Sequence, residues 1–459
     1  MTLSPAGWLE RPPAAAPALA WPGGLLTRGG LAERIARLAG AVEAALSPGA
    51  PLAVVSASRA ELVIGVLAGA WSGRPVLPLE PGRPDLAALL AVCGVGAAVT
   101  DHDAVLPAGL ARIAPDAAAA PRAAATPAAT ALLVPTSGTT GAARVAMLPA
   151  PALAAQAAAS AQRLPALGAR DRWVVCLPMT SIGGLAALWR CMAAGACLAV
   201  LERFDAGAAL ALMAEGASHA SVVPAMLDPL LEAGAPPPAL RCLLAGGGPL
   251  SAAAAGRAVA AGWPLWTGWG MTETASHVAA GPVDSGWREG QAGRALPGMR
   301  IAADPDSGRL RVAGPALMSG YAAPGLAPGA GLEADGSFLT GDLGEVDRDG
   351  TVRLRGRADD AIVTGGVNVD PATVEAALAA CPGAGETAVC GLADPRWGQR
   401  LVALYTGNAP VGTLEAWARD HLPSPQRPRR YLRVASLPRN AMGKLVRRDL
   451  PALAGVGPS

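Results

Sequence analysis

The chain has 459 residues, of which 52% are hydrophobic and 16% charged, and its formal net charge is +2. This composition excludes a disordered chain, and the interspersed charges exclude a basic stripe of the kind that binds nucleic acid. The apolar runs are far shorter than the ~20 residues of a membrane span, the first residues lack a signal-peptide pattern, and the seven cysteines form no CxxC pair, so we expect a cytoplasmic protein with reduced thiols.

Residues 31–267 alternate segments of helical spacing with short apolar segments of strand length. Such an alternation is typical of a doubly wound, parallel sheet and predicts an α/β fold. A stretch of low complexity at 114–130 is expected to be a surface connection. The predicted elements are helix 31–46, strand 52–56, helix 59–72, strand 75–79, helix 84–94, strands 97–100, 131–134 and 173–177, helix 184–194, strand 197–201, helix 207–215, strand 219–223, helix 224–233, strand 241–245, helix 251–261 and strand 264–267.

The character of the sequence changes near residue 290. Short strand-like segments follow one another and are separated by turns rich in Asp and Gly, which is typical of antiparallel β structure. A small α+β unit then starts near residue 358. The predicted elements of this part are strands 299–303, 309–313, 338–339, 343–347 and 351–355, helix 371–380, and strands 386–392 and 400–405.

Lys444 is the only lysine of the chain, since the rest of the 37 Lys and Arg residues are arginine. Arg is a planar fork with five donors, whereas Lys is a compact point charge on a flexible stem. The alternative interpretation is that one lysine escaped a composition bias. Because Lys444 ends the segment PRNAMGK at 438–444, we favour a position that needs a small cation among several oxygens.

A loop rich in Ser, Thr and Gly, PTSGTTG at 135–141, follows the predicted strand 131–134. Its small residues let the backbone approach a polyphosphate, and its hydroxyl and N–H groups can form an anion nest. It is neither a Walker A loop nor a GxGxxG motif, so P-loop and Rossmann nucleotide binding are not predicted. Taken alone, such a loop is more often a simple turn.

Five further motifs follow this loop, and they are GGGPLS (246–251), GWGMTETAS (268–276), FLTGDLG (338–344), RLRGRADDAIVTGGVNVDPATVE (353–375) and LPRNAMGKLVRR (437–448). In this order and spacing, the set resembles the ANL superfamily of adenylate-forming enzymes over essentially the whole chain. The resemblance implies a large N-terminal domain, residues 1–358, with doubly wound sheets and a small β-barrel-like section. It also implies a mobile α+β C-terminal domain, residues 359–459, and an active site between the two.

The resemblance implies two half-reactions. A carboxylate attacks the α-phosphate of ATP, which gives an acyl-adenylate and pyrophosphate, and a thiol, usually that of coenzyme A, then displaces AMP. Such chemistry depends on positioning and on electrostatic stabilisation around crowded phosphate oxygens. ATP, Mg²⁺ and coenzyme A are therefore the expected cofactor and co-substrates.

The same resemblance assigns nucleotide-binding residues. The β- and γ-phosphates would be held by Thr136, Ser137, Gly138, Thr139, Thr140 and Gly141, with Arg144 where the family usually has Lys. The adenine would lie against Gly247, Gly248, Pro249, Trp269 and Gly270. Trp269 stands in place of the usual Tyr and offers a larger stacking face without a hydroxyl.

The residues expected to carry the chemistry are Thr272 on the α-phosphate, Glu273 on Mg²⁺, Asp342 on the ribose hydroxyls, and Arg357 on the ribose and phosphates. A solvated surface acid and a turn Asp are the plain alternatives for Glu273 and Asp342. Lys444 would bridge the attacking carboxylate and the α-phosphate in the first half-reaction only. The small domain would then rotate about Asp359 and bring the loop of Gly365 and Gly366 beside the pantetheine arm of coenzyme A.

The acid substrate is indicated by weaker signals. The segments 217–251 and 296–301 and the short length are similar to o-succinylbenzoate–CoA ligases of menaquinone biosynthesis. Arg190 falls where that subfamily carries a basic residue for the succinyl carboxylate, although an Arg lying over apolar surface at a helix end is an equal alternative. Thr180 and Ser181 replace the usual aromatic-His gate, and we count Ser181 with Arg190 as an acid-binding residue.

These signals predict an ATP-dependent acid–CoA ligase of the o-succinylbenzoate type. The alternatives are a CoA ligase for another aryl or short acyl acid, acyl loading of a carrier protein, and a nucleotide-binding homologue that has lost catalysis. Val367 replaces the Glu of the family's common GGEN and is a further sign of divergence. The expected partners are a small carboxylic acid, ATP and coenzyme A, with no nucleic acid and no membrane span, and a homodimer is left open.

Overall fold

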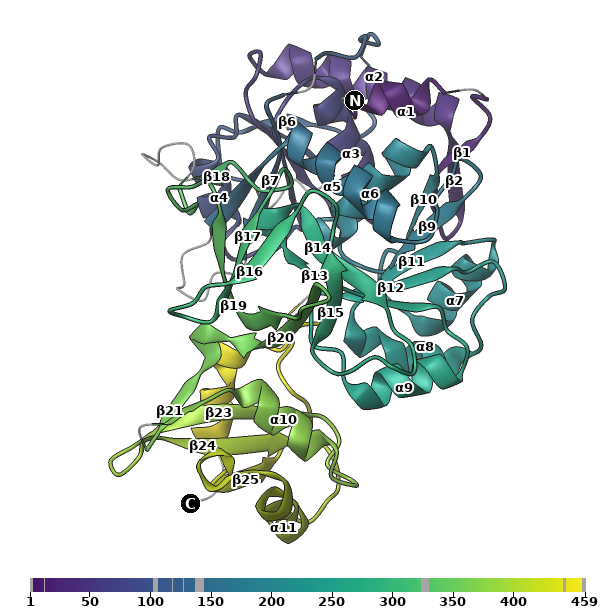
Figure 1. The fold of residues 1–459 in the computed structure, drawn as a ribbon. Coiled ribbons are helices and arrows are strands. Elements are labelled where there is room, and N and C mark those ends of the chain that lie inside the picture. Colours follow the sequence, from purple (N-terminus) through teal and green to yellow (C-terminus); the bar gives the residue numbers. More distant parts are fainter. Residues whose placement is uncertain are drawn as a thin grey trace.

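The computed structural model describes residues 3–11, 13–101, 106–117, 119–126, 128–136, 144–322, 330–365, 367–440 and 443–455. A large body is built on two sheets, and a small body at the C-terminal end of the chain is built on a third (Figure 1). Helices cover the sheets of both bodies, which confirms the predicted α/β class.

The first sheet has 13 strands. In spatial order they are β16 (Arg300–Ala303), β17 (Arg309–Ala313), β19 (Phe338–Val346), β20 (Thr351–Arg357), β15 (Gln291–Ala295), β14 (Ser276–Pro282), β13 (Leu265–Met271), β12 (Cys242–Gly246), β11 (His219–Val222), β9 (Arg172–Val175), β10 (Cys197–Val200), β1 (Pro17–Trp21) and β2 (Gly24–Thr27). The neighbours from β13 to β1 are parallel. This parallel centre is the doubly wound arrangement that the alternating sequence predicts.

The predicted β-barrel-like section forms no closed barrel among the described residues. Strand β15 pairs antiparallel with β14 and with β20, so this section continues the first sheet at one edge instead of closing on itself. The two predicted strands 338–339 and 343–347 are a single strand, β19, with an irregular register between Leu343 and Gly344. A bulge of this kind bends a strand without ending it.

The second sheet has seven strands. In spatial order they are β18 (Gly320–Ala322), β8 (Arg144–Pro149), β7 (Thr130–Thr136), β4 (Val76–Leu79), β3 (Leu52–Val55), β5 (Ala97–Thr100) and β6 (Ala111–Ile113). The helices of the large body are α1 (Pro5–Leu9), α2 (Arg28–Ala45), α3 (Arg59–Trp71), α4 (Leu86–Val92), α5 (Ala150–Arg163), α6 (Ile182–Ala194), α7 (Ala206–Ala214), α8 (Leu227–Ala233) and α9 (Ala252–Ala260). Helices α3 and α5 contact strands of both sheets, and the main core lies around them.

Short polar residues begin many of these helices. Each accepts a hydrogen bond from a backbone N–H of the first turn, and the residues are Thr27, Ser58, Ser181, Asp205, Ser251 and Asp370. Helix α6 ends at Gly195, whose φ of 76° is the left-handed conformation that glycine adopts most readily. The cap at each end fixes the length of α6, which carries Arg190 on a buried face.

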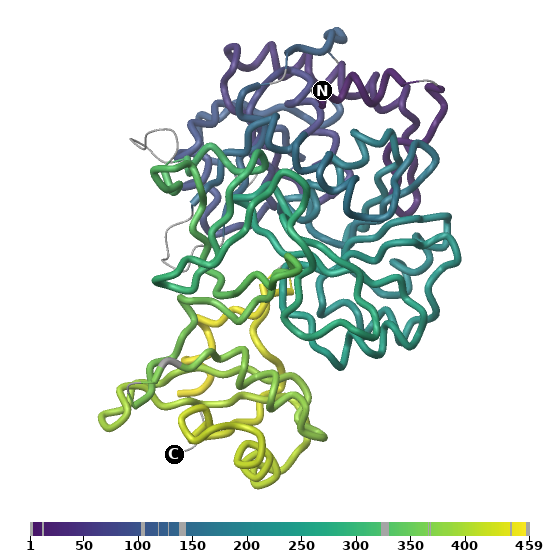
Figure 2. Tube along the Cα trace, in the orientation of Figure 1, coloured from purple at the N-terminus to yellow at the C-terminus, as the bar shows by residue number. Residues whose placement is uncertain are grey.

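The small body contains β21 (Ile362–Thr364), β22 (Val367–Val369), β23 (Thr387–Asp394), β24 (Gly398–Tyr405), β25 (Arg430–Arg433), α10 (Pro371–Ala379), α11 (Val411–His421) and α12 (Leu450–Gly455). It touches the large body through contacts of α10 with β20. Figure 2 shows the yellow C-terminal trace rising from the small body toward the green strands of the first sheet. No helix in the described part of the chain is long and apolar enough to cross a membrane.

Candidate active site

The site lies where the parallel strands of the first sheet end, close to the small body. Open α/β sheets bind ligands at the carboxyl ends of their strands. Strand β12 runs directly into Gly247 and Gly248, and β13 runs into the short 3-10 helix Thr272–Thr274. Strands β19 and β20 bring Asp342 and Arg357 together as cross-strand partners.

Asp342 is held by two side chains. The indole Nε1–H of Trp269 donates to Oδ2 at 2.8 Å, and a guanidinium N–H of Arg357 donates to Oδ1 at 3.1 Å. The backbone N–H of Asp342 donates to Oγ1 of Thr340 at 3.1 Å. The carboxylate is thus fixed in orientation, and Asp342 lies within strand β19 instead of in a turn.

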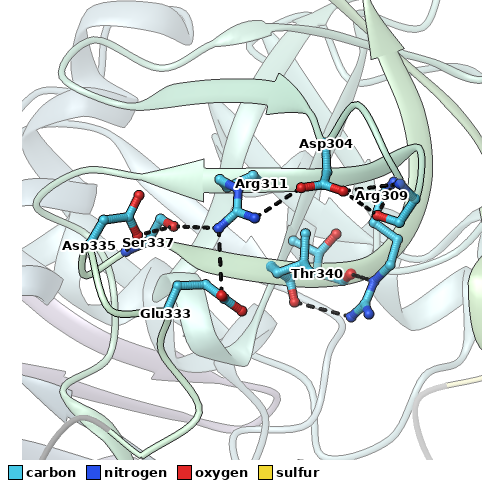
Figure 3. A network of polar contacts seen from close by, with 9 residues as sticks. Asp304, Arg309, Arg311, Glu333, Asp335, Ser337 and Thr340 are labelled. Atoms are coloured by element: carbon cyan, nitrogen blue, oxygen red, sulfur yellow. Dashed lines mark hydrogen bonds and ion pairs between the residues drawn. The ribbon is translucent and has the colours of Figure 1, made fainter.

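A network of polar contacts stiffens the strands that lead to Asp342 (Figure 3). Arg309 donates to the carbonyl of Thr340 at 2.6 Å, and Arg311 donates to Asp304 and to Ser337, both at 3.0 Å. Hydrogen bonds from Ser307 and then from Arg311 lower the pKa of Asp304 to about 2. The network ties β16, β17 and β19 together beside the carboxylate of Asp342.

The side chain of Lys444 reaches the glycine loop after β12. A methyl group on Gly247 would lie 3.4 Å from Cε of Lys444 and 4.0 Å from Nζ, and Gly247 has a φ of +79°. The residue as a whole is exposed, although protein groups lie around its ammonium. Burial lowers the pKa of Lys444, and the nearby carboxylates of Asp342 and Glu273 partly oppose that change.

Glu273 faces a tyrosine that the sequence analysis did not identify. The hydroxyl of Tyr321 donates to Oε1 of Glu273 at 2.6 Å, and burial together with this carboxylate raises the pKa of Tyr321. No group of three or more His, Cys, Asp or Glu residues that could hold a metal occurs among the described residues. One carboxylate suits Mg²⁺, because this ion keeps water and takes phosphate oxygens as its other ligands.

The phosphate loop is described only at its two ends. Thr136 and Arg144 are paired across β7 and β8, and the hydroxyl of Thr136 donates to the carbonyl of Arg144 at 3.3 Å. The guanidinium of Arg144 lies 5.4 Å from the ring centre of Tyr321, so a cation is held near Glu273. The residues between, Ser137, Gly138, Thr139, Thr140 and Gly141, lie outside the described part.

Arg190 lies in a buried polar cluster away from Lys444. Its guanidinium donates to Gln156 at 3.2 Å, to Ser276 at 3.0 Å and to Ser160 at 3.3 Å, and it lies 3.1 Å from Nδ1 of His277. Every one of these partners is neutral, and no described acid forms an ion pair with Arg190. Burial lowers the pKa of Arg190 to about 10.

The sequence analysis missed Gln156, Ser160 and His277. Gln156 and Ser160 are one helical turn apart on α5, and Gln156 donates to Ser160 at 2.9 Å. Ser160 lies 3.1 Å from Nε2 of His277. Since Arg190 donates to Nδ1, Nε2 carries the proton, and burial lowers the pKa of His277 well below its ordinary value.

Ser181 and Arg190 are not brought together. The hydroxyl of Ser181 caps the start of α6 and donates to the carbonyl of Pro178 at 2.8 Å. Arg190 is nine residues further along the same helix, which corresponds to about 13 Å. The two side chains therefore do not contact each other.

The hinge segment is tied to the Lys444 loop. Arg447 binds Glu375 at 2.6 Å and Asp360 at 3.1 Å, while Arg357 lies 3.7 Å from Asp359. Gly365 lies in the turn between β21 and β22, and its N–H donates to the carbonyl of Trp397 at 2.8 Å within the small body. Gly366 lies outside the described part.

Comparisons with known proteins agree with this geometry. The sequence matches the AMP-binding enzyme family over residues 6–322 and the AMP-binding enzyme C-terminal domain over residues 373–444. A 2-succinylbenzoate–CoA ligase of Bacillus velezensis is 34% identical over 337 residues, which cover 71% of this chain and 69% of that protein. The o-succinylbenzoate CoA synthetase (MenE) of Bacillus subtilis in complex with the acyl-adenylate intermediate OSB-AMP has a TM-score of 0.89 and 28% identity, covering 98% of both chains.

A double mutant of the same Bacillus subtilis enzyme, bound to its product analogue OSB-NCoA, has a TM-score of 0.74 at the same identity and coverage. The structure described above resembles the adenylate complex more than the product-analogue complex. Its matched residues, its fold and the side chains around Lys444 establish that the chain belongs to the AMP-binding enzyme family.

Proposed function

We propose that the protein is an ATP-dependent acid–CoA ligase that acts on o-succinylbenzoate. The observation that carries this proposal is the placement of the only lysine beside the glycine loop, near the carboxylates of Asp342 and Glu273. The relatives named above are ligases or synthetases of this acid and of coenzyme A. A homologue that has lost catalysis would have no reason to keep this set of charges together.

In the first half-reaction, an oxygen of the acid attacks the α-phosphorus of ATP, and the bond to the β-phosphate oxygen breaks. Lys444 neutralises the attacking carboxylate and the α-phosphate, which would otherwise repel each other. Thr272 donates a hydrogen bond to the α-phosphate, and Arg357 forms ion pairs with the phosphates. Asp342 accepts hydrogen bonds from the ribose hydroxyls. Glu273 would hold Mg²⁺, which would supply positive charge to the phosphate oxygens when bound.

The phosphate loop and the adenine site complete the nucleotide contacts. The polyphosphate binds Thr136, Arg144 and the intervening residues, because small side chains and N–H groups suit an anion. Gly247, Gly248, Pro249 and Gly270 leave room for the base. Any Cβ at Gly270 would approach the carbonyl oxygen of Ser276 to 2.0 Å, so this strand end must be glycine.

In the second half-reaction, the thiol sulfur of coenzyme A attacks the acyl carbon. A thioester bond forms, the bond from the acyl carbon to the phosphate oxygen breaks, and AMP leaves. Residues 359–459 rotate about Asp359 as one domain, so Lys444 leaves and Gly365 and Gly366 approach the pantetheine arm. Arg447 forms ion pairs with Asp360 and with Glu375. The Lys444 loop therefore moves together with Asp360.

Arg190 provides the preference for a dicarboxylate. The carboxylate that is joined to AMP loses its charge, so only the second carboxylate of o-succinylbenzoate can pair with a cation. A buried guanidinium with neutral protein partners gains most from such a counter-ion. A ligase for a monocarboxylic aryl or short acyl acid would leave Arg190 without one.

The proposal is tested by pyrophosphate release with a panel of carboxylic acids, with and without coenzyme A. We expect release with o-succinylbenzoate in the absence of coenzyme A, and formation of its thioester when coenzyme A is added. Release with only a simple aryl or fatty acid would contradict the choice of acid. Thioester formation only on an added carrier protein would contradict the choice of acceptor.

Two further predictions accompany this function. The protein is proposed to act in the cytoplasm, where ATP and coenzyme A are available, and to form a homodimer. Sedimentation at several concentrations tests the second point, and a mass that stays at that of one chain would contradict it.

A further inference from the structure

We infer that Trp269 is a positioning residue that orients the ribose-binding carboxylate of Asp342, and that it is not a stacking surface for adenine. This inference rests on the proposed function of Asp342 as the acceptor for ribose hydroxyls. It concerns nucleotide recognition and does not depend on which acid is activated.

The indole ring of Trp269 is packed inside the protein. Trp269 lies on β13 and is only 6% exposed, and it belongs to the main hydrophobic core of the large body. A ring that is to stack on a ligand has to present one open face, and such a face would be exposed when the ligand is absent. Little of this ring is left for a base to cover.

The polar end of the ring is directed at Asp342. The indole nitrogen can only donate, and it donates to Oδ2 at 2.8 Å. A Tyr at this position would carry a hydroxyl that can both donate and accept, so it would not fix the partner as an acceptor. Trp269 therefore fixes the rotation of the carboxylate about its last bond.

The hydrogen bonds of the carboxylate leave room for two ribose hydroxyls. Each oxygen of an ionised carboxylate has about two acceptor sites. Trp269 uses one site on Oδ2 and Arg357 uses one on Oδ1, so one site on each oxygen remains. Two neighbouring hydroxyls can then donate to the two oxygens of a carboxylate that is already oriented.

The test measures binding of AMP and of 2′,3′-dideoxy-AMP to wild type and to Trp269→Phe by titration calorimetry. We expect the affinity for AMP to fall by about tenfold in Trp269→Phe, in line with the loss of one hydrogen bond to a charged group. Binding of the dideoxy nucleotide should change by no more than about twofold, because it has no hydroxyl for Asp342. The control is Trp266→Phe on the same strand, whose ring has no bond to Asp342 and which should leave both affinities unchanged.

An equal loss for both nucleotides would overturn the inference, because it would indicate stacking on the base or a general loss of structure. An unchanged affinity for AMP would overturn it as well. If Trp269→Phe does not fold, Trp269→Leu replaces it, since this variant also has no side-chain donor for Asp342. Binding of AMP without any acid-dependent pyrophosphate release would refute the proposed function and leave this inference intact.

Discussion

The positions of Lys444 and of the arginines near it favour cations of different size and shape. Arg357 and Arg144 pair with oxygens or rings at the rim of the site, where a planar fork is suitable. The ammonium of Lys444 instead fits against Gly247, where a guanidinium would need more space. The single lysine of the sequence is thus found against a glycine, where the slimmer cation fits.

The pH dependence of the first half-reaction follows from this environment. Lys444 acts only while it is protonated, and burial lowers its pKa from the ordinary value of 10.5. Pyrophosphate release should therefore be retained at pH values below the lowered pKa and lost as the pH rises through it. Initial rates between about pH 7 and 10 test this, with thioester formation from supplied acyl-adenylate as the control, because that half-reaction does not use Lys444. An alkaline loss that both half-reactions share would assign the titration to another group.

Removal of the buried cation should change the choice of acid. In Arg190→Met, kcat/KM for o-succinylbenzoate is expected to fall about 100-fold, because a charge-assisted hydrogen bond in a buried site is lost. For a monocarboxylic aryl acid the decrease should be much smaller. The control Arg257→Met removes an exposed ion pair with Asp228 on the surface. Equal losses for both acids would mean that Arg190 only supports the fold.

Among the elements, helix α6 links the polar cluster around Arg190 to the rest of the core. Ser181 caps its first turn, and Arg28 and Arg11 donate to the carbonyls of Gly195 and Ala193 at its last turn. Cations at a helix C-terminus and a hydroxyl at its N-terminus both satisfy backbone groups that the helix leaves free. Arg190 is therefore carried by a helix that is fixed at both ends.

Substitutions of Ser181 distinguish a role in capping helix α6 from a role in binding the acid. Ser181→Ala should lower the free energy of unfolding by about 1 kcal/mol, whereas Ser181→Asp should retain most of it, because Asp also accepts from the first-turn N–H groups. Denaturant unfolding and kcat/KM for the acid are measured on both. If Ser181 binds the acid, both variants lose activity regardless of stability.

How far the sequence predicts an element depends on how local its signal is. Strand 97–100 agrees with β5 residue for residue, because its apolar run is short and bounded by Gly and Asp. Helix α5 was not predicted, since an Ala-rich segment shows little contrast between its faces. Strand β1 was not predicted either, because it pairs with β10 from a distant part of the chain.

The same limit applies to the site. Lys444 was singled out as the only lysine of the chain, whereas Glu273 and Asp342 were predicted through motifs that resemble the ANL superfamily. The bond from Trp269 to Asp342 and the cluster around Arg190 depend on how β13, β19, α5 and β14 pack, and no local pattern encodes such packing. Only the pair Gln156 and Ser160, with its helical spacing and its polar character in an Ala-rich segment, gave a signal that could have been used.

On the scale of the whole molecule, the small body places a side chain against a loop of the large body. Lys444 comes from the small body and touches the loop of the large one. At the same interface, a Cβ on Gly356 would lie 2.4 Å from a carboxylate oxygen of Asp370, so the bodies meet without space for a side chain. The better match to the adenylate complex than to the product-analogue complex agrees with this arrangement.

Arg447 is predicted to keep the Lys444 loop attached to the small body. Its partners Glu375 and Asp360 are largely buried, and burial raises the pKa of each. Arg447→Ala leaves both carboxylates without their cation and should lower the free energy of unfolding by roughly 2–3 kcal/mol, somewhat less than for a fully buried pair. It should also slow pyrophosphate release. The control Arg448→Ala removes a neighbouring, exposed arginine and should change neither quantity.

The central claim is that Lys444 serves one half-reaction of an acid–CoA ligase, and the Lys444→Ala variant tests it most directly. Acid-dependent pyrophosphate release and thioester formation from supplied acyl-adenylate are measured separately. We expect the first to fall by about 100-fold or more, as for other groups that stabilise transition-state charge, and the second to stay close to that of wild type. A similar fall in both half-reactions would contradict the account.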